Sequence, residues 1–333
     1  MKCKRKRTAN KNDPTRKKYF GMNGIQKNIT FIAKISSKTN NEYAEVYSAF
    51  DFGTKVAIKL VKNESRLAEQ FENECAALEM CNSEFVIKIH ERIISEDQTY
   101  LGIIMDFMEN NLFQYVQNTK NEINEFQARQ IISQVLSGIK YIHSIGIIHP
   151  DISPFNILIT VDLWGTPQVC ITGFSLAAKP NKEGTVHGQY GNKCFWAPEI
   201  VLNRPFSYSA NIWSAGIVAF YVLTRHVPYD QAEENRMFSQ ILTRIEFLPC
   251  FVMNPTLNFM QKDLIMRMMQ IEPGDRLSAE QALNHKWLEG FPVKANTAET
   301  LSFIFTTVEV PFGQNPFSSS TNSDNDFDYD TYT

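Results

Sequence analysis

The chain has 333 residues, 43% of them hydrophobic, and a formal net charge of −3 at pH 7. This length can bury one large core or two lobes. The small net charge excludes a strong whole-protein field for nucleic acid or membrane, and the longest apolar stretch, Ala215–Leu223, is too short to span a bilayer. Six scattered cysteines without a C-x-x-C pair favour buried thiols in a reducing compartment.

Both ends of the chain have the composition of disordered tails. Residues 1–18 hold nine Lys or Arg and one acidic residue, and we predict a basic disordered tail over residues 1–27. Residues 1–18 resemble a nuclear import signal or a nucleic-acid patch, although a solvated tail is the simpler interpretation. No signal peptide is expected, so we expect a cytoplasmic protein, with nuclear import through this tail as the alternative. Residues 291–333 are interpreted as a short extension and an acidic, Ser/Thr-rich disordered tail.

Strand patterns come first along the chain and helical patterns later. β-branched and aromatic runs joined by a D-F-G-T turn predict a hairpin, and apolar residues at helical spacing predict helices. The predicted elements, in order, are a hairpin at 42–61, a helix at 66–81, a strand at 100–108, a helix at 127–144 and mainly helices after residue 200. This order predicts an α+β chain in two lobes.

One carboxylate is predicted on a buried helix face. Glu74 follows Leu67 by seven residues and precedes Leu78 by four, so it shares their inward face. A buried carboxylate is costly unless it is paired. Lys59, at the end of the strand segment V-A-I-K, is the obvious partner.

The central motifs resemble those of the eukaryotic protein kinase superfamily, Ser/Thr type. Ile147–Leu158 resembles the catalytic loop H-R-D-L-x-x-x-N, with His149, Asp151 and Asn156 at its characteristic positions. Residues 56–59 resemble the V-A-I-K strand. The resemblance covers about 260 residues in family order, and its C-terminal end is most similar to the calmodulin-dependent kinase group.

The resemblance implies a fold and a set of roles. It implies a two-lobed kinase-like domain over residues 28–290, with a small β-rich lobe to about residue 108 and a larger helical lobe from about residue 109. In an active member, Lys59 would hold the ATP phosphates, Glu74 would orient Lys59, Asp151 would accept the hydroxyl proton and Asn156 would bind a metal ion.

Further positions follow from the same resemblance. Ala197–Glu199 resembles A-P-E, and its glutamate would pair with Arg276 in a structural role. Leu78, His149 and Phe174 match positions that stack between the lobes. The residues expected around the adenine base and the hinge are Val46, Ala57, Met105, Asp106, Phe107, Met108 and Leu158.

Several charged or glycine positions of the family are lost. Gly173 stands where the D-F-G aspartate would hold magnesium, and glycine has no oxygen to offer. Thr39, Asn41 and Ala44 replace the three glycines of the phosphate-binding loop, which would let backbone N–H groups approach the phosphates.

The catalytic loop and its surroundings depart from the family as well. The substitutions are Pro150 for the H-R-D arginine, Ser153 for the catalytic-loop lysine, Asn192 for a threonine before A-P-E and Asn211 for the aspartate that braces the loop. Phosphoryl transfer depends on positioning and charge stabilisation, and each lost stabilising group commonly costs about 10²–10³ in rate.

These losses favour a pseudokinase with a regulatory or scaffolding role and weak or no phosphotransfer. ATP binding is expected to be weak or metal-independent, and magnesium binding is disfavoured. The expected partner is a protein, such as an active kinase or another signalling protein. The alternative is an atypical, low-activity Ser/Thr kinase that uses the retained Asp151. A third hypothesis is that the basic tail binds nucleic acid and the kinase fold serves only as its platform.

Overall fold

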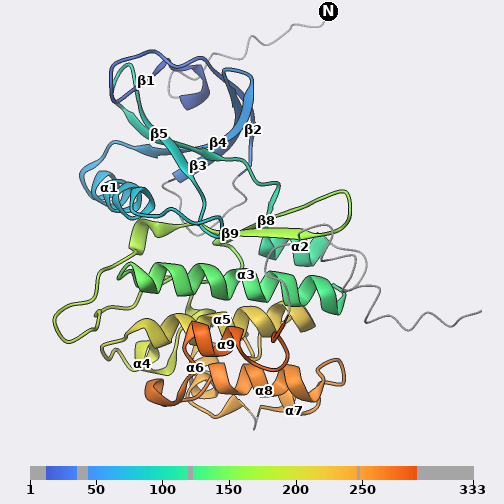
Figure 1. Cartoon of the computed structure of the whole chain (residues 1–333). Coiled ribbons are helices and arrows are strands. Elements are labelled where there is room, and N and C mark those ends of the chain that lie inside the picture. The colour runs from blue at the N-terminus through green and yellow to red at the C-terminus, as the bar shows by residue number, and fades with distance from the viewer. Residues whose placement is uncertain (1–12, 36–43, 119–122, 246–247, 291–333) are drawn as a thin grey trace, which may run out of the picture. The chain divides into compact units, whose positions relative to one another are not determined.

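The computed structural model describes residues 13–35, 44–118, 123–245 and 248–290. The chain divides into one unit over residues 1–294 and another over residues 295–333, and the second unit lies wholly outside the described residues. Within the first unit, a strand-rich lobe is followed by a helical lobe (Figure 1). The predicted two-lobed α+β architecture is therefore confirmed.

The small lobe is built on one antiparallel sheet. Its six strands are ordered β1-β5-β6-β4-β3-β2, and α1 packs beside them (Figure 1). The elements are β1 (Tyr19–Gly21), β2 (Ile29–Lys34), β3 (Ala44–Asp51), β4 (Thr54–Lys62), α1 (Ser65–Glu79), β5 (Ile89–Ser95) and β6 (Tyr100–Asp106).

The predicted hairpin is formed by β3 and β4. Asp51 pairs with Thr54, which leaves a two-residue loop of Phe52 and Gly53, both with positive φ. A two-residue loop with this backbone matches the right-handed twist of the flanking strands. The register also pairs Val46 with Lys59, so the predicted phosphate-binding lysine lies beside a predicted adenine-contacting residue.

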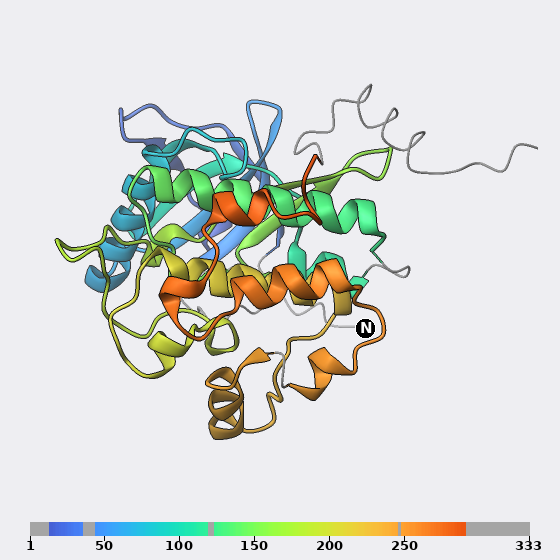
Figure 2. The same cartoon turned by 60° about the horizontal axis from the view of Figure 1, so that its bottom comes forward.

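The large lobe surrounds two long helices. The helix α3 begins with a capping box between Asn124 and Gln127, and α5 is buried along most of its length. Figure 2 shows α3 (green) beside the yellow and orange-to-red helices of the C-terminal half, and the contacts of α3 with α5 and α9 agree. The elements are β7 (Asn110–Asn111), α2 (Leu112–Asn118), α3 (Glu125–Ser144), β8 (Ile157–Val161), β9 (Pro167–Ile171), α4 (Pro198–Val201), α5 (Tyr208–Thr224), α6 (Glu234–Ile241), α7 (Pro249–Val252), α8 (Phe259–Met268) and α9 (Ala279–Leu283).

The prediction of a disordered tail is wrong for residues 13–27, which include strand β1. We expected a disordered tail through residue 27, but β1 pairs with β5 and Tyr19 is 1% exposed. The Tyr19 hydroxyl donates to the Pro14 carbonyl at 3.0 Å, and Lys27 Nζ lies 2.7 Å from Glu91 Oε2. Composition alone does not show that lysines of this segment pair with carboxylates of neighbouring strands and turns. Residues 1–12 lie outside the described residues.

No helix among the described residues is long and apolar enough to cross a membrane.

We predict that Tyr19→Ala lowers the free energy of unfolding by about 3 kcal/mol, because it empties a buried aromatic site at the sheet edge. Met22→Ala is the matched control, since Met22 lies in the same segment and is 65% exposed. Urea denaturation of both variants measures the difference. Equal stability of the two variants would contradict a structural role for β1.

Candidate active site

The predicted Lys59–Glu74 ion pair is present. Lys59 Nζ, on β4, lies 2.5 Å from Glu74 Oε2, on α1. Glu74 is 2% exposed and shares its helix face with Leu67, Phe71 and Leu78. A buried charge is tolerated when it is paired and hydrogen-bonded. Because Glu74 needs Lys59 as its partner, the pair holds α1 close to β4.

The helix α1 is also joined to the segment that follows Gly173. Asn73 Nδ2 donates to the carbonyl oxygens of Ser175 at 3.0 Å and Ala177 at 2.9 Å. This role of Asn73 could not be predicted from the sequence, because its partners are backbone groups about a hundred residues away. The two bonds hold residues 175–177 against α1.

Three apolar or aromatic side chains continue this contact between the lobes. Leu78, His149 and Phe174 are each no more than 2% exposed. The His149 and Phe174 rings meet edge to face, with centroids 4.8 Å apart. His149 Nε2 lies 3.0 Å from the Thr172 carbonyl oxygen, so its ring is hydrogen-bonded within the core.

Asn211 braces the catalytic loop in both directions. Its Oδ1 accepts the backbone N–H of His149 at 3.1 Å, and its Nδ2 donates to the His149 carbonyl at 2.7 Å. A carboxylate has no N–H to donate, so the amide makes a bond to the His149 carbonyl that an ionised aspartate cannot make.

A second histidine contacts the same amide. His143 Nε2 lies 3.0 Å from Asn211 Oδ1, and its ring packs against Tyr208 at 4.7 Å. Burial lowers the pKa of His143 from 6.5 to about 4, with the Asn211 hydrogen bond opposing the shift. The neutral imidazole is therefore the form that the fold holds.

This shift predicts a pH dependence of stability. Between pH 6.5 and about 4, His143 is mainly protonated in the unfolded chain and mainly neutral in the folded chain. The free energy of unfolding should therefore fall as the pH falls through this window, by about 3 kcal/mol at pH 4. The pKa of His149 is lowered in the same direction by burial.

Urea denaturation at pH 7.0, 5.5 and 4.5 measures the effect. His143→Gln keeps a donor for Asn211 and removes the titrating group, so its stability should depend less on pH than that of the unaltered chain. Parallel pH curves for the two proteins would contradict the assignment.

Asp151, the predicted base, is hydrogen-bonded within the protein through both carboxylate oxygens. Oδ1 accepts the backbone N–H of Asn192 at 2.9 Å, and Oδ2 accepts Nδ2 of Asn156 at 2.7 Å. Asn156 Nδ2 also donates to the Asp151 carbonyl at 2.9 Å. The predicted metal-binding asparagine thus uses its amide nitrogen to hold the predicted base. The Asn192 contact was missed, because it uses a backbone group.

Two glycines leave the space for this arrangement. Gly173 has φ +81°, and a Cβ there would lie 2.5 Å from Asn156 Oδ1. Gly191 has φ +78°, and a Cβ there would lie 2.5 Å from Asp151 Oδ1. L residues rarely adopt this backbone. A side chain at residue 173 would therefore require strained backbone and movement of Asn156.

The donor set does not fit a magnesium ion held by carboxylates. Magnesium in nucleotide sites is bound through one or two carboxylates together with the phosphates. Gly173 has no side chain, and both oxygens of Asp151 are hydrogen-bonded. Among the described residues, no group of three or more His, Cys, Asp or Glu could hold a metal ion.

The residues predicted to surround the adenine base are apolar and lie in or against one core. Ala57 pairs with Met105 across β4 and β6, and both are 5% exposed. Val46 and Leu158 are partly buried against the same core. These apolar side chains would hold the adenine of ATP, whose triphosphate supplies the phosphoryl group in the family. Lys59 would meet the phosphates.

The hinge and phosphate-loop positions lie at the edges of this region. Asp106 ends β6, and its Oδ1 lies 2.6 Å from His90 Nε2. Lys55 Nζ lies 3.9 Å from the centroid of the Phe107 ring, and Met108 is buried. Ala44 begins β3, whereas residues 39 and 41 lie outside the described residues.

Ser153, which stands at the position of the missing lysine, is buried. It is 1% exposed, and its hydroxyl has no hydrogen-bond partner among the described residues. A neutral, enclosed hydroxyl cannot supply the positive charge that stabilises a transferring phosphoryl group.

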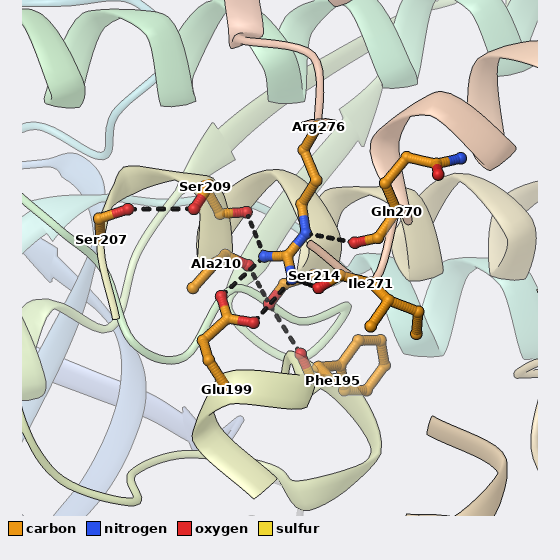
Figure 3. Close-up of polar contacts among 9 residues, drawn as sticks. All are labelled: Phe195, Glu199, Ser207, Ser209, Ala210, Ser214, Gln270, Ile271 and Arg276. Atoms are coloured by element: carbon orange, nitrogen blue, oxygen red, sulfur yellow. Dashed lines mark hydrogen bonds and ion pairs between the residues drawn. The ribbon is translucent and has the colours of Figure 1, made fainter. Parts of the chain in front are cut away.

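A buried ion pair holds the A-P-E-like segment Ala197–Glu199. Both terminal nitrogens of Arg276 donate to Glu199 at 2.7 Å. The remaining N–H groups reach the carbonyl oxygens of Ser209, Gln270 and Ile271 (Figure 3). All five donors of the guanidinium are used, so the predicted structural pairing is present.

We predict that Glu199→Ala lowers the free energy of unfolding by about 3–5 kcal/mol, because it leaves the Arg276 charge buried without a counter-ion. Lys140→Ala is the control, since its pair with Glu280 is exposed and should contribute less than about 1 kcal/mol. Chemical denaturation measures both. A Glu199→Ala effect no larger than that of the control would contradict the bracing role.

Comparison with known proteins agrees with this geometry. The protein kinase domain family matches residues 40–288. Since this match covers well over half of the chain, the chain belongs to the protein kinase domain family. β1 lies before the matched region.

The curated relatives include named kinases. The chain is 28% identical over 237 residues to human serine/threonine-protein kinase H1. The aligned region covers 70% of this chain and 54% of that protein. It is 28% identical over 222 residues to a serine/threonine-protein kinase H1 homolog of Pinctada fucata, covering 66% and 52%. It is 27% identical over 258 residues to fatty acyl-CoA synthetase and RNA processing-associated kinase 1 of Saccharomyces cerevisiae, covering 73% and 28%. The chain thus spans about half the length of the kinase H1 relatives and less of the yeast protein.

Proposed function

We propose that this protein kinase domain is a pseudokinase that regulates or scaffolds a protein partner, with weak or no phosphotransfer. The single observation that carries the proposal is the cluster formed by Asp151, Asn156 and Gly173. The groups that would bind metal and accept a proton are hydrogen-bonded to each other or are missing. Catalysis would have to break these bonds and find another source of charge.

The contacts that define the kinase shape support a binding role. The Lys59–Glu74 pair, the His149–Phe174 contact and the Asn73 bonds hold α1 against the large lobe. None of these interactions requires phosphoryl transfer. The partner is an active kinase or another signalling protein that binds the surface of this fold. ATP binds weakly or without a metal ion.

A low-activity Ser/Thr kinase is the second candidate, and the retained Asp151 favours it. In that case the γ-phosphate of ATP passes to a protein hydroxyl, with Asp151 as the base and Lys59 on the phosphates. The missing charges at Gly173 and Ser153 would each lower the rate by about 10²–10³.

Phosphate transfer from labelled ATP separates the two candidates. We predict that the purified chain, supplied with a mixture of Ser- and Thr-containing peptides and with magnesium or manganese, incorporates no more label than Asp151→Ala. The reason is the loss of charge stabilisation at the site.

Incorporation that requires a metal ion and disappears in Asp151→Ala would overturn the pseudokinase proposal in favour of the kinase. Circular dichroism of the two proteins is the control, because Asp151→Ala removes two hydrogen-bond acceptors and must be shown to fold.

A further inference from the structure

The hairpin of β8 and β9 ends in a turn that carries two neighbouring large apolar side chains. Leu163 is 101% exposed and Trp164 is 81% exposed, which makes them the two most exposed large hydrophobic side chains among the described residues. Single exposed apolar residues are common on protein surfaces, but here two project together from one turn. Figure 1 shows α3 between this hairpin and α8.

The turn is held by its own hydrogen bonds. Asp162 Oδ1 accepts the backbone N–H groups of Trp164 at 2.9 Å and Thr166 at 2.8 Å. The Gly165 N–H donates to the Asp162 carbonyl at 3.0 Å, and Gly165 has φ +80°, which glycine adopts readily. Gln127 Nε2, on α3, donates to the Gly165 carbonyl at 3.1 Å. The two apolar side chains therefore start from a fixed backbone, which lowers the ordering cost of binding.

The polar groups of the turn are satisfied without water. The N–H groups of Trp164, Gly165 and Thr166 are all bonded inside the protein. Asp162 is the only charged residue between residues 157 and 172, and its carboxylate accepts two of these bonds. A backbone group without a partner is costly in a bilayer. The turn can therefore leave water at a lower cost than a loop with open N–H groups.

The apolar area of the turn suits a membrane better than a folded protein partner. A buried aromatic side chain contributes about 150–250 Å², so Trp164 and Leu163 together offer on the order of 400 Å². A stable protein interface takes about 800 Å² from each partner. A bilayer can accept a protruding wedge of this size, and Trp is enriched at the boundary between headgroups and acyl chains.

The chain also contains a basic segment that complements an anionic lipid surface. Residues 1–12 hold six Lys or Arg and no Asp or Glu, and they lie outside the described residues. Polybasic segments are attracted to membranes that contain anionic lipids. One small hydrophobic anchor gives marginal, reversible binding, whereas an anchor combined with a polybasic segment binds stably. The local charge of this segment therefore favours an anionic membrane.

We propose that the β8–β9 turn inserts Leu163 and Trp164 into the headgroup region of an anionic membrane, with the basic segment at residues 1–12 held on the same surface by charge. This contact is peripheral and requires no helix that crosses the bilayer. The inference goes beyond the proposed function, because it requires neither ATP nor phosphate transfer, and it holds for a pseudokinase and for a kinase alike.

Vesicle binding tests the proposal. The purified full-length chain, without nucleotide, is sedimented with vesicles of phosphatidylcholine alone and with vesicles that also contain about 30% phosphatidylserine, an anionic lipid. We expect stronger binding to the anionic vesicles, and high salt should weaken it by screening the charges.

Trp164 also reports its own insertion. The other three tryptophans of the chain are no more than 6% exposed, so a change of solvent on vesicle binding should come from Trp164. Its fluorescence should shift to shorter wavelength and be quenched by phosphatidylcholine that is brominated in its acyl chains. Absence of binding to the anionic vesicles, or binding without this quenching, would overturn the proposal.

Matched variants locate the contact. Trp164→Ser should weaken binding to anionic vesicles by roughly tenfold or more, as expected when one large apolar side chain is no longer buried, and should remove the fluorescence shift. Leu163→Ser should weaken binding and keep the shift. Phe259→Ser is the control, since Phe259 is 76% exposed on α8, across α3 from the hairpin (Figure 1).

Two further results would contradict the assignment. Equal binding by Trp164→Ser and Phe259→Ser would show that the turn does not make the contact. Self-association of the chain without lipid that is lost in Trp164→Ser would overturn the membrane proposal in favour of a second copy as the occupant. Because no nucleotide is present, neither result bears on the phosphate-transfer experiment.

Discussion

Glu74 carries a charge on a helix face that is otherwise apolar, and this constraint positions the residues around it. A carboxylate that is 2% exposed is stable only with a partner, so α1 must keep Lys59 of β4 within reach. Once α1 is held there, Asn73, the preceding residue, meets the backbone of Ser175 and Ala177. Leu78, one turn later, lies in the same buried core as Phe174, whose ring contacts that of His149. The Lys59–Glu74 pair therefore positions α1 for its contacts with the large lobe.

The carboxylate of Asp151 is also partnered, but by neutral hydrogen-bond donors and not by a cation. Its carboxylate receives hydrogen bonds from Asn156 and from the backbone of Asn192, and Gly173 and Gly191 leave room for both groups. The protein therefore contains two carboxylates with opposite consequences. Glu74 pairs with the cation of Lys59, whereas Asp151 accepts hydrogen bonds from Asn156 of its own loop and from the backbone of Asn192. The shape of the domain and the chemistry of its site depend on separate interactions, and the first can persist without the second.

The sequence predicted those features that depend on local patterns or on one charged pair. Helical spacing was enough to place Glu74 inward and to assign Lys59 as its partner, and the D-F-G-T turn was enough to predict the hairpin. It could not predict the contacts that join a side chain to distant backbone. Asn73, the two-way bridge of Asn211 and the Asn192 N–H on Asp151 all belong to this class. The error over residues 13–27 has a similar cause, because β1 is stable only through pairing with β5.

Retention of Asp151 is the strongest argument for catalysis, and the geometry weakens it. In a loop that only served phosphoryl transfer, the carboxylate would be dispensable once the chemistry was lost. Here its two oxygens accept the Asn192 N–H and the Asn156 amide. Removing it would leave these donors without that partner, at a cost of about 1–3 kcal/mol for each one that water cannot reach. The aspartate would therefore have a structural role even in a kinase fold that transferred no phosphate. The missing charge at Gly173, in contrast, bears directly on the chemistry.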